Sequence, residues 1–366
     1  MIILVNSTHF IPVGGSNFFD DYLANFAASK REHQFIFIVP VSPAIPFTFP
    51  PNIIQVISSP KANNPLMWKL WLNYTLPAIA RKYKADLLIH SGGVCSLRTR
   101  LPQWTFISDL SFLHLPQFFE KKQLRFLIKN MPAFLNKAGT IVTASGFITN
   151  EIEQYYSVDN QKIQTHPLVA GSLYQTIEWE EKEALKEKYA DGKEYFFFNG
   201  DIHPRHKLVN LLKAFSFFKK RQKSNMQLII AGKTLSENDP FIDSLKTYKY
   251  RKEVNVLMDL REKDLAKITA AAYAFVYPSL YAGMALQALQ AMQCGVPVIT
   301  SNTGALIETC GEAALYMDAE NFEDIADKMM LMFKDENLRS GLINKGSLIV
   351  QQHNKSNDRL WEGILG

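Results

Sequence analysis

Cysteines and long apolar runs are scarce in this sequence, and both shortages exclude classes of protein. The 366 residues contain only three cysteines, Cys95, Cys294 and Cys310, which lie far apart. An odd number of widely separated cysteines argues against a disulfide framework or a zinc site and favours a reduced, intracellular setting. No run of about 18 apolar residues occurs, so we expect no segment to span a membrane. Residues 1–6 lack a basic start and a long apolar stretch, and we interpret them as a core strand, not a signal peptide.

A strong excess of one charge is missing as well. Lys and Arg outnumber Asp and Glu by 40 to 35, which gives a formal net charge of +5. This mild excess is compatible with a phosphate-rich ligand or an anionic membrane surface, but it is too small to indicate nucleic acid. No nucleic-acid-binding motif is present, so we expect no nucleic-acid partner. Hydrophobic residues make up 47% of the chain, which is enough for two domains with a core each.

Short apolar segments rich in strand formers alternate with helical patterns along the whole chain. Such alternation predicts an α/β protein with parallel, doubly wound sheets and right-handed crossovers. A charged run at 178–188 separates the two halves, and we interpret it as a solvated helix near the domain junction. The expected strands are 2–6, 33–40, 52–59, 85–92, 104–109, 139–145, 195–200, 226–232, 254–259, 275–277, 296–299 and 314–318.

The stretch 275–304 organises the second half. It reads as a strand, a turn at Gly283, a helix from Met284 to Gln293 without Gly or Pro, and a further strand. A helix would then begin just beyond the carboxyl end of a strand. Its unpaired backbone N–H groups and the positive end of its dipole could hold an anion such as a diphosphate. An ordinary strand–helix–strand unit with nothing bound is the alternative.

The same stretch resembles the donor-binding segment of family 4 glycosyltransferases, which are retaining enzymes of the GT-B fold. The residues in register are Pro278, Ser279, Gly283, Leu286, Ala291, Met292, Cys294, Gly295, Pro297, Val298 and Ile299. The resemblance implies two facing Rossmann-like domains with a cleft between them. It places an acceptor-side domain at 1–170 and a nucleotide-sugar-binding domain at 171–349, with a C-terminal helix, 350–366, packing back on the first domain.

The resemblance also assigns donor contacts within this stretch. Gly283 and the N–H groups of Met284 and Ala285 would hold the donor diphosphate. The two glutamates of the family pattern fall on Ala282 and Gln290, where the first contacts the transferred sugar and the second the ribose. Gln290 can still hydrogen-bond a ribose hydroxyl without a charge, whereas Ala282 has no polar group.

Two positions in the first half match further family positions. The pair Gly14 and Gly15 resembles the glycines whose backbone approaches the diphosphate, a closeness that a Cβ would prevent; a flexible turn is the alternative. The histidine that contacts the donor sugar in the family falls on Ser108, which is followed by Asp109. A turn-capping role for Asp109 is the alternative there.

The second half offers a basic run and an acid. Arg205 matches the family arginine, whereas His206 falls on the usual lysine and Lys207 on the usual asparagine; we expect these residues to neutralise the diphosphate. A basic helix start that faces solvent is the alternative. Asp201 occupies a place where many relatives carry arginine. Glu308 matches the glutamate that orients the nucleobase, with a helix N-terminal acid as the alternative.

The resemblance implies transfer of a hexose, such as mannose, from a GDP- or UDP-hexose to a glycan or a lipid-linked acceptor with retention. No Asp-x-Asp triplet occurs, so we expect no metal, and we expect no cofactor either. The protein would be cytoplasmic. The basic and apolar helix at 121–130 would contact the inner face of the membrane, unless it is a plain surface helix.

No residue is identified as the catalytic base. Four family contact positions are altered together, at Ser108, His206, Ala282 and Gln290. A catalytically silent GT-B protein that binds a nucleotide, a glycan or a partner transferase is therefore the alternative function.

Overall fold

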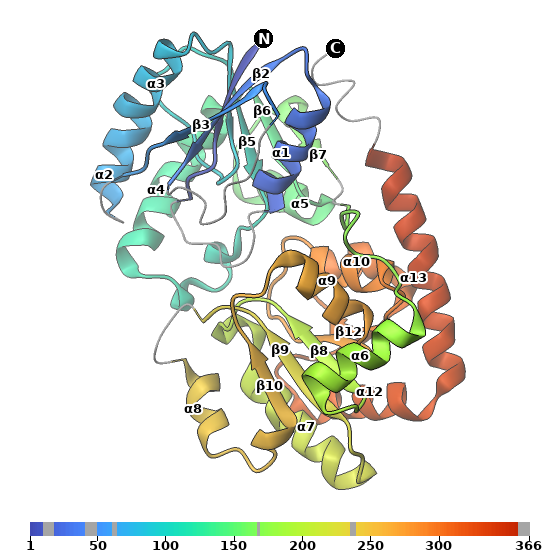
Figure 1. The fold of residues 1–366 in the computed structure, drawn as a ribbon. Coiled ribbons are helices and arrows are strands. Elements are labelled where there is room, and N and C mark those ends of the chain that lie inside the picture. The colour runs from blue at the N-terminus through green and yellow to red at the C-terminus, as the bar shows by residue number, and fades with distance from the viewer. Residues whose placement is uncertain (10–17, 41–49, 61–63, 167–168, 235–238, 358–366) are drawn as a thin grey trace. The chain divides into compact units, whose positions relative to one another are not determined.

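The structure, a computed structural model, describes residues 1–9, 18–40, 50–60, 64–166, 169–234 and 239–357. The chain divides into two compact units, which we call unit 1 (Met1–His166) and unit 2 (Pro167–Gly366). Each unit is built on one parallel sheet with helices between its strands (Figure 1). The predicted α/β class with two doubly wound parallel sheets is confirmed.

Unit 1 holds a seven-stranded sheet in the order β3-β2-β1-β4-β5-β6-β7. Every strand pairs in parallel with its neighbour, and the order reverses between β1 and β4. Right-handed crossovers on the two sides of this reversal place the helices on opposite faces of the sheet. The strands are β1 (Ile2–Asn6), β2 (Gln34–Val39), β3 (Ile53–Ile57), β4 (Leu87–His90), β5 (Gln103–Ile107), β6 (Thr140–Thr143) and β7 (Ile163–Thr165).

The helices of unit 1 connect these strands. A π-helical segment, Trp71–Thr75, joins α2 to α3 into one continuous rod. Helix α4 extends seven residues beyond the stretch that the sequence indicated, because its apolar spacing continues through the buried Phe134 and Leu135. The helices are α1 (Phe18–Ser29), α2 (Pro65–Leu70), α3 (Leu76–Lys82), α4 (Lys121–Lys137) and α5 (Gly146–Tyr155).

Unit 2 holds a six-stranded parallel sheet in the order β10-β9-β8-β11-β12-β13. Its order reverses between β8 and β11, both of which are buried at every position but the last of β8. In such sheets ligands bind beyond the carboxyl ends of the strands at the reversal. The strands are β8 (Tyr195–Asn199), β9 (Gln227–Ala231), β10 (Val254–Leu257), β11 (Ala274–Tyr277), β12 (Val298–Ser301) and β13 (Ala314–Met317).

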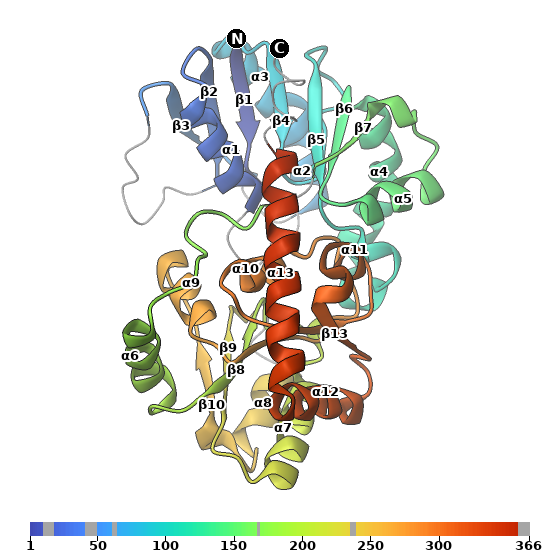
Figure 2. The same cartoon turned by 90° about the vertical axis from the view of Figure 1, so that its right-hand side faces the viewer.

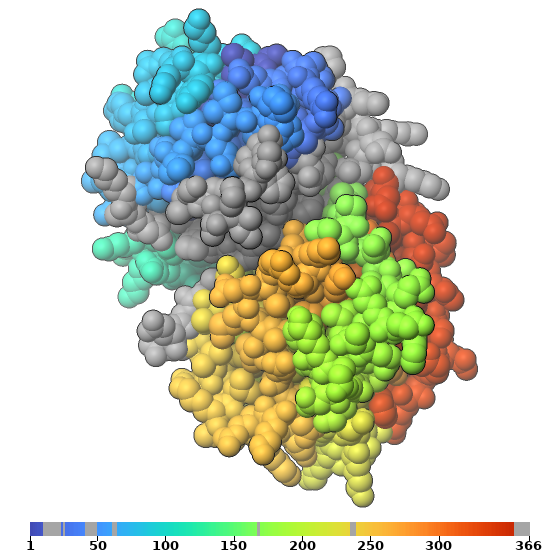
Figure 3. Space-filling model, in the orientation of Figure 1, coloured from blue at the N-terminus to red at the C-terminus, as the bar shows by residue number. Residues whose placement is uncertain are grey.

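The charged run predicted as a solvated helix is α6, which lies on the face of unit 2 seen in Figure 3. All of its residues except Lys186 and Ala190 are exposed or partly exposed. The long helix α13 lies along unit 2 and contacts α10 (Figure 2). The helices of unit 2 are α6 (Trp179–Ala190), α7 (Leu208–Gln222), α8 (Pro240–Lys246), α9 (Glu262–Ala270), α10 (Leu286–Gln293), α11 (Ala305–Cys310), α12 (Phe322–Lys334) and α13 (Glu336–Asn357).

The structure describes part of the predicted C-terminal helix at 350–366. Helix α13 includes the first residues of the predicted C-terminal helix at 350–366. Residues 358–366 lie outside the described residues. The return of this helix to the first domain therefore stays a prediction.

Candidate functional site

The candidate site lies at the carboxyl edge of the unit 2 sheet, where the strand order reverses. Two loops leave this edge, 200–207 after β8 and 278–285 after β11. The N–H of Leu280 donates to the carbonyl oxygen of Arg205 at 2.9 Å, so the two loops are tied together. The structure thus brings the predicted basic residues and the predicted helix start to the same edge of one sheet.

Helix α10 begins at Leu286, two residues later than the sequence indicated, because Ala285 departs from helical geometry with φ −116° and ψ 35°. Ala285 is the N-cap residue, and no side chain of the described residues caps this end of the helix. An alanine methyl cannot accept a hydrogen bond, so the N-cap side chain does not offset the positive end of the helix dipole. The end is suited to an anion.

Ser279 and Ser301 fix the loop that leads to this helix start. The N–H of Ser279 donates to Ser301 Oγ at 2.7 Å, and Ser279 Oγ donates to the carbonyl of Tyr281 at 2.8 Å. Both serines are buried. The sequence analysis matched Ser279 to the family pattern but missed Ser301, whose only signal was a small polar residue at the end of a strand.

Ala282 and Gln290, the two positions of the family glutamates, are both buried. The carbonyl of Ala282 accepts a hydrogen bond from the N–H of Ala305 at 2.9 Å, which links the loop to the start of α11. Gln290 lies in the second turn of α10, and its side-chain amide makes no hydrogen bond with the residues that the structure describes. Glu308 is an exposed acid in the first turn of α11.

The basic turn, which we define as Arg205 to Lys207, has an internal structure of its own. The N–H of Arg205 donates to Nδ1 of His203 at 3.2 Å, and Nε of Arg205 donates to Nε2 of His206 at 3.1 Å. Lys207 has a positive φ of 45°, and its Nζ lies 3.2 Å from Oε1 of Glu320. Arg205 and Lys207 are both partly exposed to solvent beside the start of α7.

His206 differs from the two cations that flank it. Its ring is buried, and the centre of the ring lies 5.6 Å from the ring centre of Phe198 and 5.2 Å from that of Tyr277. Burial first, and then the neighbouring Arg205, lower the pKa of His206 well below its usual 6.5. His206 is therefore neutral near pH 7 and brings no positive charge to the basic turn.

Asp201, at the end of β8, is the acid nearest to this turn in sequence, and it is buried. Burial raises its pKa to about 6, against the opposing effect of Arg205 and Lys233. The carboxylate makes no hydrogen bond with the described part of the chain. Beside it the ends of β8 and β9 approach so closely that a Cβ on Gly232 would lie 1.8 Å from the carbonyl oxygen of Gly200, so only glycine fits at Gly232.

The remaining candidate residues belong to unit 1. Gly14 and Gly15 lie outside the described residues. Asp109 Oδ1 accepts a hydrogen bond from the N–H of Ser111 at 2.6 Å, which confirms the turn-capping role considered for it. Ser108, the residue before it, is half-buried directly after β5.

Sequence reasoning missed two polar arrangements in unit 1. His114 Nε2 pairs with the buried carboxylate of Glu151 on α5. The buried ring of His90 is hydrogen-bonded on both sides: Nδ1 lies 3.2 Å from Nδ2 of Asn6, and Nε2 lies 3.0 Å from Oε1 of Gln103. Burial lowers the pKa of His90 to about 4. Neither arrangement has a short sequence motif, because its members come from distant segments.

Metal clusters and membrane-spanning helices are both absent from the described residues. Within the described ranges, no group of three or more His, Cys, Asp or Glu side chains is arranged to hold a metal ion. No described helix combines the length and the apolar character needed to cross a membrane.

Comparison with known proteins identifies the class. Residues 179–348 match the family model for glycosyl transferases group 1. The chain is 28% identical over 254 residues to O-antigen chain mannosyltransferase B of Escherichia coli, covering 69% of this chain and 67% of the relative. It is 24% identical over 282 residues to O-antigen chain mannosyltransferase RfbU of Salmonella typhimurium strain LT2, covering 74% and 72%.

Solved structures resemble the whole chain. Sucrose-phosphate synthase from Thermosynechococcus elongatus aligns with a TM-score of 0.80 at 18% identity, covering 100% of this chain and 99% of that chain. Anabaena HepE, solved in complex with UDP and glucose, aligns with a TM-score of 0.77 at 16% identity and the same coverage.

The fold and these matches identify a glycosyltransferase of the GT-B fold. The match to the group 1 glycosyl transferases covers the segment 179–348. The resemblance predicted from the motif at 275–304 is confirmed.

Proposed function

We propose that this chain transfers a hexose, with mannose as the leading candidate, from a nucleotide-sugar to a glycan or a lipid-linked acceptor with retention of configuration. One observation carries the proposal: the uncapped start of α10 and the basic turn are tied together at the carboxyl edge of the unit 2 sheet. The mannosyltransferase names of the relatives, and the UDP and glucose bound in the HepE complex, support the choice of substrates.

Each side chain of the site has a proposed task. The N–H groups at Gly283, Met284 and Ala285 would face the donor diphosphate, and Arg205 and Lys207 would neutralise its charge. These groups would replace a metal ion, so the reaction would need neither a metal nor another cofactor. His206, which is buried and neutral, would not touch the phosphates.

The remaining donor contacts are weaker than in the family pattern. Gln290 would bind a ribose hydroxyl with an amide that makes no hydrogen bond with the described residues. Glu308, which is exposed at the start of α11, would accept a hydrogen bond from the nucleobase. Ala282 leaves the transferred sugar without a carboxylate partner, so donor binding would depend more on the diphosphate than it does in the family pattern.

A donor screen tests the proposal. The purified protein is incubated with GDP-, UDP- and ADP-hexoses, and nucleotide release and thermal shift are measured with and without EDTA. We expect release that EDTA does not reduce, and an axial anomeric linkage by NMR when an α-linked donor is used. A thermal shift without release would favour the silent binder, and neither signal at millimolar donor would contradict both functions.

We also propose that unit 1 contacts an anionic membrane surface at the cytoplasmic face, where a lipid-linked acceptor would be presented. Residues 64–137 contain eleven Lys and Arg but only three Asp and Glu, a formal charge of +8, whereas the whole chain carries only +5. Helix α4 exposes Lys121, Lys122, Arg125 and Lys129, with the 55% exposed Ile128 among them. Basic charge around exposed apolar side chains is typical of peripheral membrane contact.

Helix α2, which contacts α4, adds an apolar stripe to this surface. Leu66, Leu70 and Tyr74 recur every four residues, and each is at least 44% exposed. The guanidinium of Arg98 lies 4.7 Å from the ring centroid of Tyr74, so a cation borders the stripe. The apolar side chains would enter the interface while the cations pair with lipid phosphates.

Vesicle sedimentation tests the membrane contact. We expect the protein to bind phosphatidylglycerol vesicles more strongly than phosphatidylcholine vesicles, and less strongly as salt rises. Reversing three α4 charges, Lys121→Glu, Lys122→Glu and Arg125→Glu, should reduce binding at least tenfold, since each is worth about 1 kcal/mol. The control reverses three exposed cations of unit 2, Lys213, Lys220 and Lys334. Equal losses in the two triple variants would contradict a surface on unit 1.

A further inference from the structure

His206 occupies the position of a family lysine, but its surroundings are those of a core residue. Its ring is 1% exposed and packs against the rings of Phe198 and Tyr277, which stack on each other. A residue so enclosed cannot touch a donor. A leucine or a phenylalanine would fill such an aromatic cluster equally well, so packing alone does not explain a histidine here.

The hydrogen bonding of the ring supplies the explanation. Nε of Arg205 carries a hydrogen and cannot accept, so at 3.1 Å Nε2 of His206 must be the acceptor. In the neutral ring the proton is then assigned to Nδ1, which is buried and has no hydrogen-bond partner within the described chain. A buried N–H without a partner costs free energy. The hydrogen bond from Arg205 therefore imposes this cost on Nδ1, and the fold keeps the bond nevertheless.

Three contacts with described residues hold Arg205. Its N–H donates to His203 Nδ1 at 3.2 Å, its carbonyl accepts from the N–H of Leu280 at 2.9 Å, and its Nε donates to His206. The first two contacts fix the backbone beside the loop that leads to α10. The third restricts the long side chain, whose rotamer freedom would otherwise oppose ordered binding.

We propose that His206 is a positioning residue, a neutral acceptor that holds Arg205 Nε so that the guanidinium faces the donor diphosphate. The inference rests on the proposed function, in which this edge binds a nucleotide-sugar. The positioning role explains why a histidine stands at the lysine position. The charge that the family lysine would bring is offset by ordering Arg205 in advance, not by a second cation. The pKa of His206, lowered by burial, keeps the acceptor unprotonated at neutral pH.

A double-mutant cycle tests this role, with GDP and UDP as probes and their affinities measured by calorimetry at pH 7.5. His206→Phe keeps an aromatic ring in the cluster but removes the acceptor. We expect it to weaken nucleoside diphosphate binding about tenfold, the effect of losing one charge-assisted hydrogen bond. In the Arg205→Ala background the same change should have no effect, because the guanidinium it positions is gone. Additive losses would overturn the inference.

The conservative variant separates positioning from packing. Glutamine can place Oε1 near the position of Nε2, so His206→Gln should recover most of the affinity that His206→Phe loses. In a kinetic assay, His206→Phe should raise the KM for the donor with little change in kcat, while the thermal midpoint stays near that of the parent. If His206→Phe does not fold, a His206→Gln protein that binds as weakly as Arg205→Ala would overturn the proposal.

The outcomes distinguish this inference from the proposed function. A parent protein that binds neither GDP nor UDP at millimolar concentration would contradict both. A parent that binds, with Arg205→Ala weakened and His206→Phe unchanged, would contradict only the role of His206. A parent that binds as well after Arg205→Ala would remove the partner that His206 is proposed to position.

Discussion

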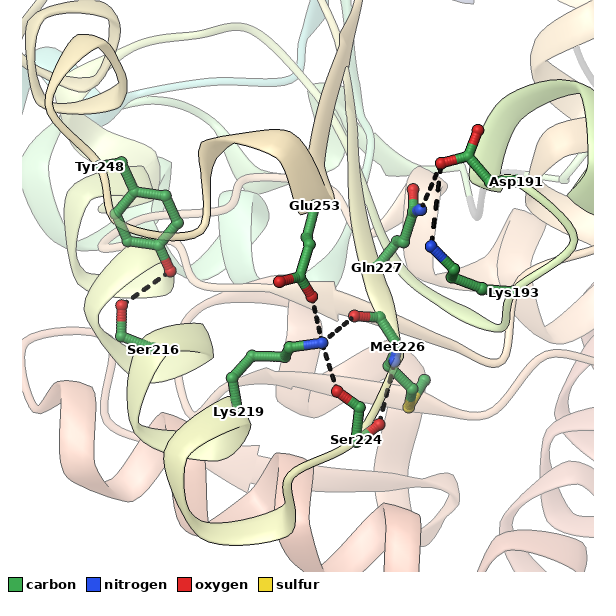
Figure 4. A network of polar contacts seen from close by, with 9 residues as sticks. All are labelled: Asp191, Lys193, Ser216, Lys219, Ser224, Met226, Gln227, Tyr248 and Glu253. Atoms are coloured by element: carbon green, nitrogen blue, oxygen red, sulfur yellow. Dashed lines mark hydrogen bonds and ion pairs between the residues drawn. The ribbon is translucent and has the colours of Figure 1, made fainter.

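The two edges of the unit 2 sheet differ in whether their buried polar groups have hydrogen-bond partners among the described residues. At the amino edge, Lys219 is a buried cation whose Nζ pairs with Glu253 and donates to the carbonyls of Ser224 and Met226 (Figure 4). At the carboxyl edge, the side chains of Asp201 and Gln290 are buried without a hydrogen bond to the described residues. The buried polar groups of the amino edge have partners within the chain, whereas these two side chains of the carboxyl edge have none among the described residues.

The difference follows from what each edge does. The amino edge closes the core, so each buried group must find a partner within the fold. Around Lys219, Ser216 donates to Tyr248 at 2.8 Å and Gln227 donates to Asp191 at 3.1 Å, and both contacts are drawn in Figure 4. Under the proposed function, the carboxyl edge leaves these groups for the donor, whose binding would offset their cost in stability.

The largest expected effect is a loss of stability at the amino edge, where the buried polar groups have partners. Lys219→Met leaves the carboxylate of Glu253 and two carbonyls without their partner, so we expect the free energy of unfolding to fall by about 3 kcal/mol. Urea denaturation measures the loss. The matched control is Lys220→Met, one position along and exposed, which should change stability by less than about 0.5 kcal/mol. Equal effects in the two variants would show that the amino edge does not depend on this network.

The second effect is on affinity, not on stability. Arg205→Ala should weaken binding of GDP or UDP about 30-fold, roughly 2 kcal/mol, because a charge-assisted phosphate contact is lost. The thermal midpoint should stay within about 2 °C of the parent. Arg221→Ala, on the far end of α7, serves as the control. If the two variants lose equal affinity, the basic turn is not the phosphate site.

The third prediction concerns the pH dependence of the buried Asp201. Its pKa is raised to about 6, so the folded protein binds a proton more tightly than the unfolded chain, and ionisation above pH 6 costs stability. Asp201→Asn removes this cost, and we expect it to stabilise the protein by about 2 kcal/mol at pH 8. The gain should shrink as pH falls through 6 and vanish below about pH 4. Thermal melts across pH 4–8 measure it, and a gain that is constant with pH would contradict the assignment.

The smallest expected effect restores a family residue. Gln290→Glu returns a carboxylate to the ribose position, and a charged acceptor binds hydroxyl donors more strongly than an amide does. We expect about a fivefold gain in nucleotide affinity, close to 1 kcal/mol. Gln293→Glu, on the same helix but bonded through its side chain to the carbonyls of Gly171 and Tyr174, is the control and should not gain. No gain at Gln290 would count against its proposed contact.

The sequence predicted most of the fold because its strands carry strong local signals. The run at 195–200 reads as a buried strand and is β8, Tyr195–Asn199. The exception is β7, Ile163–Thr165, which the sequence analysis missed. It is only three residues long, lies at the sheet edge and has no fully buried position, so no apolar pattern marks it.

The site was less predictable because its chemistry depends on packing. The motif at 275–304 located the helix start to within two residues, but it could not show that Ser301 fixes the preceding loop. His206 reads as one residue of a basic run, and only the folded chain shows it buried and neutral. The burial of Lys219 was not predicted either, because its partners Glu253 and Met226 are brought to it by the fold.

The most direct measurement is a crystal structure of the protein soaked with GDP or UDP. The account predicts that the diphosphate lies against the backbone N–H groups of Met284 and Ala285 and within hydrogen-bond distance of the Arg205 guanidinium. A nucleotide bound elsewhere in the chain, or phosphates that face away from the start of α10, would contradict it.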